Sequence, residues 1–458
     1  MIALRAEARD NLRLAGPIVL TQLGTMAMGL VDTAIVGRVG DQALASVSIG
    51  NTISFALVTP AMGVMLAVEP IVSQALGARE PLEIRRAYRT IIRLALWLTV
   101  PFMLLTWASV AALPFFKVEP ALIPGVRLYV LARLPGVLPF FLYIGAKTYQ
   151  QAVLRPRGAV EAMLIANVIN AFVGFVLVFG DAGLVRLHLP AIGLPAYGLV
   201  GTGISTSLSL MVMACWIIFV RGKPKEGSPD LLPAGAVEDR ADLGMTAKVL
   251  RLGVPIGLQL GAEAGVFSLV TVLMGSLGAR ATSGHQIALG LASFSFMGAL
   301  GISQATSVRV GISIGSEKQG GARRSGAVGL ALGVATMAVW SLVFALWPRA
   351  LARVFTNDDA IVEAAVPLIR VAAFFQLADG AQVVAAGALR GTGDTRFPLI
   401  ANVLVHWFIG LPMGYLFGFA LHHGAIGLWY GLSAGLVVIA STLTWRFFRL
   451  TRHTIARV

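Results

Sequence analysis

The feature that most constrains this chain is a series of twelve apolar stretches, each long enough to cross a bilayer as a helix, which takes about 20 residues. Charged residues make up only 13% of the 458 residues, against about 25% in soluble domains. A water-soluble enzyme and a disordered chain are therefore excluded, and we predict an all-α polytopic membrane protein. The stretches cover residues 14–37, 44–76, 91–115, 128–153, 159–180, 196–220, 252–277, 285–314, 326–348, 361–388, 397–420 and 425–447.

The basic residues indicate the topology. The chain has a net charge of +14, and 25 of its 36 lysines and arginines fall on one set of loop ends, with seven on the other side. Excess Lys and Arg marks the cytoplasmic side, so both termini are predicted to be cytoplasmic. Topology and contact with anionic membrane lipids then account for the basic balance, and no nucleic-acid partner is expected.

The chain divides into two similar halves. A polar segment, residues 221–248, is predicted to be a cytoplasmic linker between lobes of six helices each, residues 1–220 and 249–458. Each half has an even number of spans, so the repeats are parallel, and such transporters rock one half against the other around a site at the midplane. The matching segments, mostly offset by 238 residues, are Leu12-Arg13-Leu14 with Leu250-Arg251-Leu252, Pro17-Ile18 with Pro255-Ile256, Arg85-Arg86 with Arg323-Arg324, and residues 164–168 with residues 399–403.

Four acids lie deep inside the predicted spans, where a charge is costly and suggests function. Asp32, Glu263 and Asp379 have no acidic counterpart in the other half, which argues against a role in the repeated scaffold. Such carboxylates can hold a proton, a sodium ion or an organic cation, one displacing another. Glu69 precedes Pro70 and is instead expected to line a helix break.

Two neutral side chains are candidate oxygen donors for the same chemistry. Asn170 lies in the fifth span opposite Val405 in the repeat, whereas Asn167 has a partner in Asn402, which favours a structural role for that pair. Thr206 in the sixth span can add a hydroxyl oxygen, although such hydroxyls more often bond their own backbone.

The sequence gives little sign of metal binding, disulfide formation or nucleotide binding. The six histidines show no metal-ligand spacing, and the single cysteine, Cys215, excludes an internal disulfide. The glycine-rich run at residues 390–395 lacks a Walker lysine and is predicted to be a turn, so ATP is not the direct energy source. We expect no cofactor apart from a coupling ion.

Several motifs together resemble the multidrug and toxic compound extrusion (MATE) family, most closely its NorM-like branch, through nearly the whole chain. They are Val31-Asp32-Thr33 with Gly37 and Gly40, Gly284-His285-Gln286, Ser307-Val308-Arg309-Val310-Gly311, Asp379-Gly380-Ala381-Gln382 with Gly387-Ala388-Leu389-Arg390-Gly391, and Gly427-Leu428-Trp429.

This resemblance implies twelve helices in two lobes and export of cationic drugs in exchange for sodium ions or protons. It places cation-coupling or substrate-binding roles on Asp32 and Asn170 in the first lobe, and on Glu263 and Asp379 in the second, where sodium is the candidate metal. Where the family often carries a further polar residue, this chain has Gly174, so we expect coupling at Glu263 and Asp379. We further expect a monomeric, non-enzymatic protein of the inner membrane.

Two other classes of function remain open at this point. A flippase for lipid-linked precursors would need a basic central cavity, which a cluster of Arg133, Lys147 and Arg309 would provide. An intramembrane enzyme or channel is the other class, but no paired catalytic motif is present, and a two-lobe repeat is more than a simple pore requires.

Overall fold

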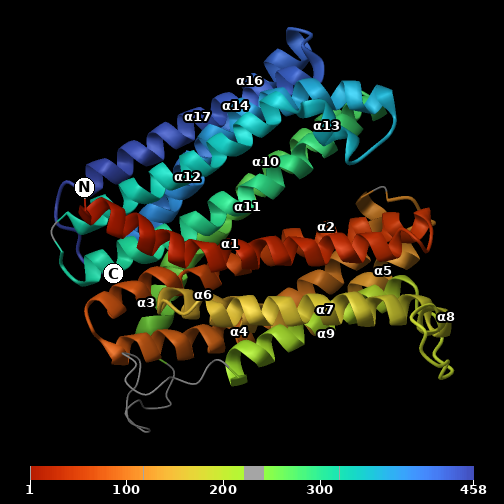
Figure 1. Ribbon diagram of the computed structural model, residues 1–458, viewed down its shortest axis with the longest axis horizontal. Coiled ribbons are helices and arrows are strands. Elements are labelled where there is room, and N and C mark those ends of the chain that lie inside the picture. The colour runs from red at the N-terminus through yellow and green to blue at the C-terminus, as the bar shows by residue number, and fades with distance from the viewer. Residues whose placement is uncertain (1, 117, 221–241, 319) are drawn as a thin grey trace. The chain divides into compact units, whose positions relative to one another are not determined.

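The computed structural model describes residues 2–116, 118–220, 242–318 and 320–458, and all regular structure in these ranges is helical (Figure 1). Twelve described helices are long and apolar enough to cross a membrane, as the sequence predicts. Helices suit this setting because they satisfy all their backbone hydrogen bonds internally, which hydrocarbon cannot do for them.

The first half of the chain forms the helices α1 (Ile2–Val36), α2 (Asp41–Leu66), α3 (Val68–Gly77), α4 (Pro81–Ala111), α5 (Ile123–Arg133), α6 (Val137–Ala152), α7 (Arg157–Phe179), α8 (Asp181–Arg186) and α9 (Leu199–Cys215). The second half forms α10 (Leu243–Ser276), α11 (Ala279–Gly315), α12 (Gly321–Leu346), α13 (Pro348–Arg353), α14 (Asp359–Thr392), α15 (Arg396–Val405), α16 (Leu411–Tyr415) and α17 (Gly424–Leu450). Short 3-10 segments are η1 (Leu113–Phe116) and η2 (Leu134–Gly136), and π-helical segments are η3 (Trp216–Val220), η4 (His406–Gly410) and η5 (Leu416–Ala420).

Several helices extend beyond their predicted spans. The first was expected to begin at residue 14, but α1 begins at Ile2, so Arg5, Arg9 and Arg13 lie within the helix. Hydropathy detects the part of a helix that lipid surrounds, whereas arginine, alanine and glutamate are good helix formers that continue it into water. The turn predicted at residues 390–395 is shorter than expected: residues 390–392 are the end of α14, and the chain turns at Gly393, which adopts the left-handed conformation with φ 86°.

The second predicted span, residues 44–76, is broken. Helix α2 ends at Leu66, and α3 starts at Val68, with Glu69 and Pro70 in its first turn. Proline lacks a backbone N–H and clashes with the carbonyl four residues earlier, so it interrupts a helix but fits in its first turn. The helix break expected beside Glu69 is thus confirmed.

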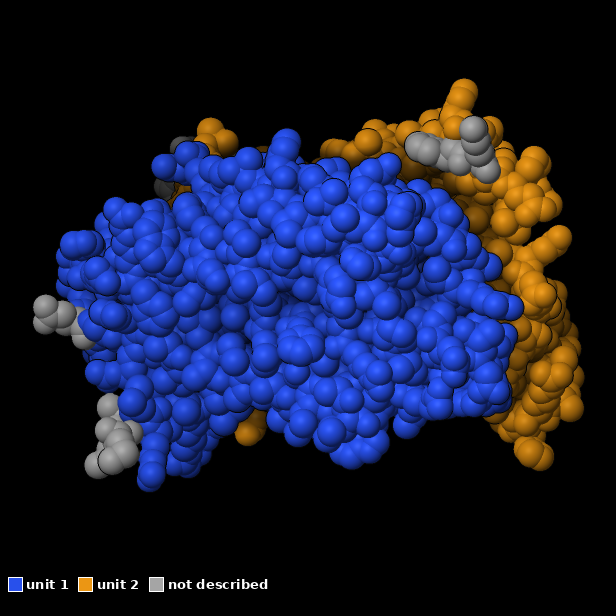
Figure 2. All heavy atoms as spheres, turned by 90° about the horizontal axis from the view of Figure 1, so that it is seen from above, with its two compact units in different colours: residues 1–19, 69–80, 251–458 blue, residues 20–68, 81–250 orange. Residues whose placement is uncertain are grey.

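By contact density the chain forms two compact units, coloured separately in Figure 2. Unit 1 contains residues 1–19, 69–80 and 251–458, and unit 2 contains residues 20–68 and 81–250. Two short segments from the first half of the sequence therefore cluster with the second half, which the sequence-based partition at residues 1–220 and 249–458 does not anticipate. Most of the predicted linker, residues 221–241, lies outside the described residues.

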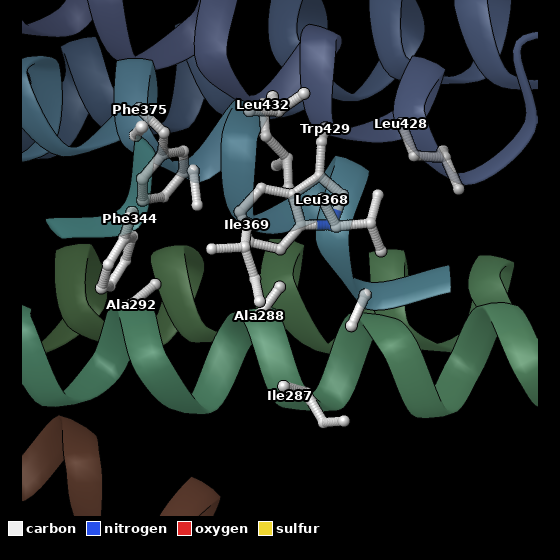
Figure 3. Packing of buried hydrophobic residues seen from close by; sticks show 14 of the residues in the cluster. Ile287, Ala288, Ala292, Phe344, Leu368, Ile369, Phe375, Leu428, Trp429 and Leu432 are labelled. Atoms are coloured by element: carbon white, nitrogen blue, oxygen red, sulfur yellow. The ribbon is translucent and has the colours of Figure 1, made fainter. Parts of the chain in front are cut away.

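The core of unit 1 is built from apolar side chains of α10, α11, α12, α14 and α17 (Figure 3). Trp429 is fully buried there and donates from Nε1 to Nδ1 of His285 at 3.1 Å, so this histidine is a satisfied core residue. Small residues bring α14 onto α11: a Cβ atom on Gly387 would lie 2.3 Å from Oγ of Ser303. Close backbone approach of this kind is how helices associate in lipid.

The two early segments of unit 1 are held by polar contacts as well as packing. Arg309 on α11 donates from Nε and Nη2 to the two carboxylate oxygens of Glu7, at 2.9 and 2.7 Å. The amide of Gln74 on α3 donates to the carbonyl of Gly391 at 3.0 Å, and Glu69 acts electrostatically on Arg390. Paired charges of this kind anchor the ends of α1 and α3 to unit 1.

Candidate functional site

Unit 1 brings two predicted acids together with two amides. Glu263 lies on α10 and Asp379 on α14, and Glu263 acts electrostatically on Asp379. Asn402 on α15 donates from Nδ2 to Oε2 of Glu263 at 3.3 Å, and the side chain of Gln382 on α14 also interacts with this carboxylate. We call Glu263, Asp379, Gln382 and Asn402 the carboxy-terminal acid site.

The carboxy-terminal acid site is rich in oxygen atoms that can still accept. Asp379 is 5% exposed, while Glu263 is partly accessible. Oδ1 of Asn402 and Oε1 of Gln382 are buried and have no hydrogen-bond partner. Burying such acceptors is costly unless a donor or a cation satisfies them. Carboxylate and amide oxygens are also the ligands that hard cations prefer.

Unit 2 assembles a second group, which we call the amino-terminal acid site: Asp32, Asn170 and Thr206. Thr206 on α9 donates from Oγ1 to Oδ2 of Asp32 on α1 at 2.8 Å, and Asn170 on α7 also interacts with this carboxylate. Asp32 is 4% exposed, and its Oδ1 has no hydrogen-bond partner. Its immediate partners are therefore a hydroxyl and an amide, with the guanidinium of Arg133 as the nearby cation.

Thr206 has two possible acceptors. Its Oγ1 lies 2.8 Å from Oδ2 of Asp32 and 2.9 Å from the carbonyl of Thr202 on the same helix. A hydroxyl carries a single hydrogen, so it cannot donate to both at once. The hydroxyl can thus turn to the carboxylate when Asp32 is charged and back to its own helix when a cation or proton takes over that role.

Gly174 explains why unit 2 has no further polar side chain at this point. A Cβ atom there would lie 3.1 Å from Oγ of Ser205 and 3.5 Å from Cδ1 of Ile35. The space in which the family resemblance places another side chain is filled by α9 and α1. The amino-terminal acid site consequently has one carboxylate, whereas the carboxy-terminal acid site has two.

Sequence reasoning missed two members of the carboxy-terminal acid site. Asn402 was expected to be structural because Asn167 repeats it, yet it contacts Glu263. Gln382 lies three residues after Asp379, and residues at that spacing share a helix face, so a signal for it was present. Asn167 does act structurally, since its amide donates to the carbonyls of Gly24 and Met163 at 3.1 and 2.9 Å.

The three basic residues that would have supported a flippase each have their own partners. Arg133 contacts Tyr129 and Asn51, and Lys147 donates to Oε1 of Gln22 at 3.1 Å. Arg309 and its partner Glu7 both lie in unit 1, whereas Arg133 and Lys147 belong to unit 2.

Two six-span repeats, each with a buried acid, define a polytopic membrane protein of the transporter type. The sequence profile of the MatE family matches residues 17–177 and again residues 255–416, which confirms the internal repeat. The chain therefore belongs to the MatE family, the multidrug and toxic compound extrusion transporters.

Similar proteins span the whole chain. A probable multidrug resistance protein NorM from Mesorhizobium japonicum is 36% identical over 455 residues, covering 98% of this chain and 95% of that protein. Another from Deinococcus radiodurans is 36% identical over 459 residues, covering 98% and 97%. The crystal structure of the eukaryotic MATE transporter AtDTX14 shares the fold, with a TM-score of 0.86 at 17% identity over 99% of this chain and 100% of that chain.

Proposed function

We propose that this protein is a secondary active antiporter that exports cationic organic compounds, including drugs, in exchange for sodium ions or protons. The observation that carries the proposal is the pair of acids Glu263 and Asp379, which interact inside membrane-spanning helices. Two negative charges in a low-dielectric environment repel one another strongly, so binding of a cation relieves both the repulsion and the burial cost. The NorM proteins to which this chain is similar are named for multidrug resistance.

The exchange follows from charge balance at the carboxy-terminal acid site. A proton or sodium ion enters from outside and neutralises part of the charge of Glu263 and Asp379. Asn402 and Gln382 supply amide groups that can reorient toward the carboxylates as their charge changes. The organic cation leaves to the outside, the two halves rock to the inward-facing state, and the ion is released to the cytoplasm as a new organic cation binds.

The amino-terminal acid site gives the organic cation a carboxylate of its own. Oδ1 of Asp32 has no hydrogen-bond partner, and Asn170 and Thr206 flank the same carboxylate. Protonating Asp32 or pairing it with an organic cation are alternative ways to neutralise it, so the two ligands compete. A drug bound there leaves when Asp32 is neutralised in another way.

The orientation is the one that the basic residues favour. Both termini and the segment 221–248 face the cytoplasm, and the protein lies in the inner membrane as a monomer. In this orientation an inward sodium or proton gradient supplies the energy, and the membrane potential adds about 2.3 kcal/mol per charge for each 100 mV.

Uptake of a fluorescent organic cation into proteoliposomes tests the proposal, with sodium and pH gradients imposed one at a time. We expect one gradient to drive accumulation against the concentration of the cation, and the other to have little effect. Accumulation that is unaffected by both gradients, or currents too large for a carrier, would overturn the antiport mechanism.

A further inference from the structure

Unit 1 has a groove on its surface that belongs to neither acid site. It has a volume of about 730 Å³ and lies between Ala381 on α14 and one face of α17. The α17 residues that line it include Ala440, Thr444 and Phe448, which recur every four residues and so follow one side of the helix, and Arg452 lines it just beyond the end of α17. Along the helix axis the positions from Ala440 to Phe448 span about 12 Å at 1.5 Å per residue.

The groove changes in character along its length. Ala381 and Ala440 make one end apolar, whereas Arg449 and Arg452 line the other end, where α17 finishes at Leu450. Trp445 lies between the two and is 54% exposed. An exposed tryptophan at the end of a spanning helix is typical of the headgroup region of a bilayer.

Within the part of the chain that the structure describes, the arginines of the groove have no acidic partner. Arg449 stacks over the ring of Trp445 at 5.0 Å, and no carboxylate of the described residues lies within ion-pair distance of Arg449 or Arg452. By contrast, the neighbouring Arg446 is paired with Asp394 at 2.9 Å. On α12, Arg323 lies over the ring of Phe448 at 5.7 Å and brings a third guanidinium beside the groove.

We propose that this groove binds an anionic glycerophospholipid, with its phosphate between Arg449 and Arg452 and one acyl chain along the apolar part. The negative end of the α17 dipole would repel an anion at this position, so the arginines are needed there. Basic pockets at the membrane surface recognise lipid headgroups in this way, and the apolar length of the groove favours a lipid over a free phosphate ion.

Native mass spectrometry of the purified protein, with phosphatidylglycerol or phosphatidylcholine added, tests this site directly. Wild-type protein is expected to retain phosphatidylglycerol in preference to phosphatidylcholine. The double variant Arg449→Gln/Arg452→Gln should lower phosphatidylglycerol affinity by about 30-fold, given about 1 kcal/mol for each basic residue. Since the readout is binding, the result does not depend on the transport proposal.

Two further variants separate a built site from general charge effects. Arg396→Gln removes an exposed arginine that does not line the groove and should leave lipid binding unchanged. Thr444→Trp fills the groove but keeps both arginines, and should also reduce binding. Equal retention of the two lipids, unchanged binding in the double variant or in Thr444→Trp, or an equal loss in Arg396→Gln would overturn the proposal. Inorganic phosphate that displaces the lipid at low concentration would overturn it too, because the acyl chain would then contribute nothing.

Discussion

Asn167 and Asn402 occupy corresponding positions in the two halves of the molecule but make different hydrogen bonds. Asn167 and Asn402 occur in the repeated sequence Leu-Ile-Ala-Asn-Val, but Asn167 donates to backbone carbonyls, whereas Asn402 donates to Glu263. The residue that corresponds to Glu263 in the first half is Thr25, whose hydroxyl donates to the carbonyl of Thr21 at 2.8 Å. The repeat therefore places an asparagine at the same position in both halves. The residue on the neighbouring helix determines whether that amide bonds to backbone carbonyls or to a carboxylate.

The comparison extends to the acids themselves. The carboxy-terminal acid site holds two carboxylates and two amides, and the amino-terminal acid site holds one carboxylate, one amide and one hydroxyl. We therefore expect ion coupling to depend on the first and binding of the organic cation on the second. Four predictions test this division of labour.

The largest effect is expected for Asp379→Asn, which keeps the size of the side chain but removes one of the two charges. Loss of charge-assisted interactions of up to about 3 kcal/mol should weaken coupling-ion binding by about 100-fold. Gradient-driven uptake and drug resistance should both fall to background at unchanged membrane abundance.

The matched control for this substitution is Glu363→Gln, also on α14, which changes an exposed acid paired with Arg349 and should leave transport intact. Full drug resistance in Asp379→Asn would show that Asp379 has no role in the mechanism. The proposed difference between the two acid sites would then be wrong as well.

Thr206→Val is expected to have the next largest effect. Valine has nearly the same shape but cannot donate to Asp32, so a hydrogen bond of 2.8 Å to a charged group is lost. Affinity for the organic cation, measured by fluorescence titration, should change by about 10-fold, and the affinity of the carboxy-terminal acid site for the coupling ion should not change.

Thr202→Val, one turn earlier on the same helix, is the comparison for Thr206→Val because the Thr202 hydroxyl has no hydrogen-bond partner. If both valine variants bind the organic cation equally well, the hydroxyl beside Asp32 has no role in binding.

Alanine substitutions of the two repeated asparagines are expected to have smaller effects, but effects that distinguish the roles of the two residues. Asn402→Ala removes a longer hydrogen bond, 3.3 Å, and should weaken coupling-ion binding by about fivefold, corresponding to about 1 kcal/mol. Asn167→Ala should instead lower thermal stability, measured by differential scanning fluorimetry, with no change in ion affinity. The reverse pattern would show that the two amides have exchanged roles.

The smallest effect is expected for Gly174→Ala. The new methyl group meets Oγ of Ser205 at 3.1 Å, and because that hydroxyl can rotate, the loss of stability should be about 1 kcal/mol. Transport at saturating drug should be unchanged. A large gain in ion affinity on introducing Gly174→Asn would instead show that the amino-terminal acid site lacks only an oxygen donor.

Much of the fold could be predicted from the sequence because lipid imposes simple rules. The twelve spans, the repeat and the turn after Thr392 follow from apolar length, spacing and glycine placement. Asp32, Glu263 and Asp379 were found because a buried charge stands out in an apolar helix. These signals are local and need no knowledge of which helices are neighbours.

The features that could not be predicted from the sequence depend on tertiary contacts. The membership of residues 1–19 and 69–80 in unit 1 involves pairing with residues about 300 positions away, such as Glu7 with Arg309. The role of Asn402 likewise depends on α10 as its neighbour, and symmetry of the sequence pointed to the opposite conclusion. A repeat predicts where a side chain lies more securely than what it contacts.

The placement of α3 in unit 1 has a consequence for biogenesis. Gln74 bonds to Gly391, 317 residues further along the chain, and Glu69 acts on Arg390 beside it. At ribosomal rates of 5–20 residues per second, α3 must wait about 15 to 60 s after its own synthesis for these partners. During this interval Gln74 and Glu69 lack these two native partners. The first half of this transporter therefore cannot complete its fold before almost the whole chain has been translated.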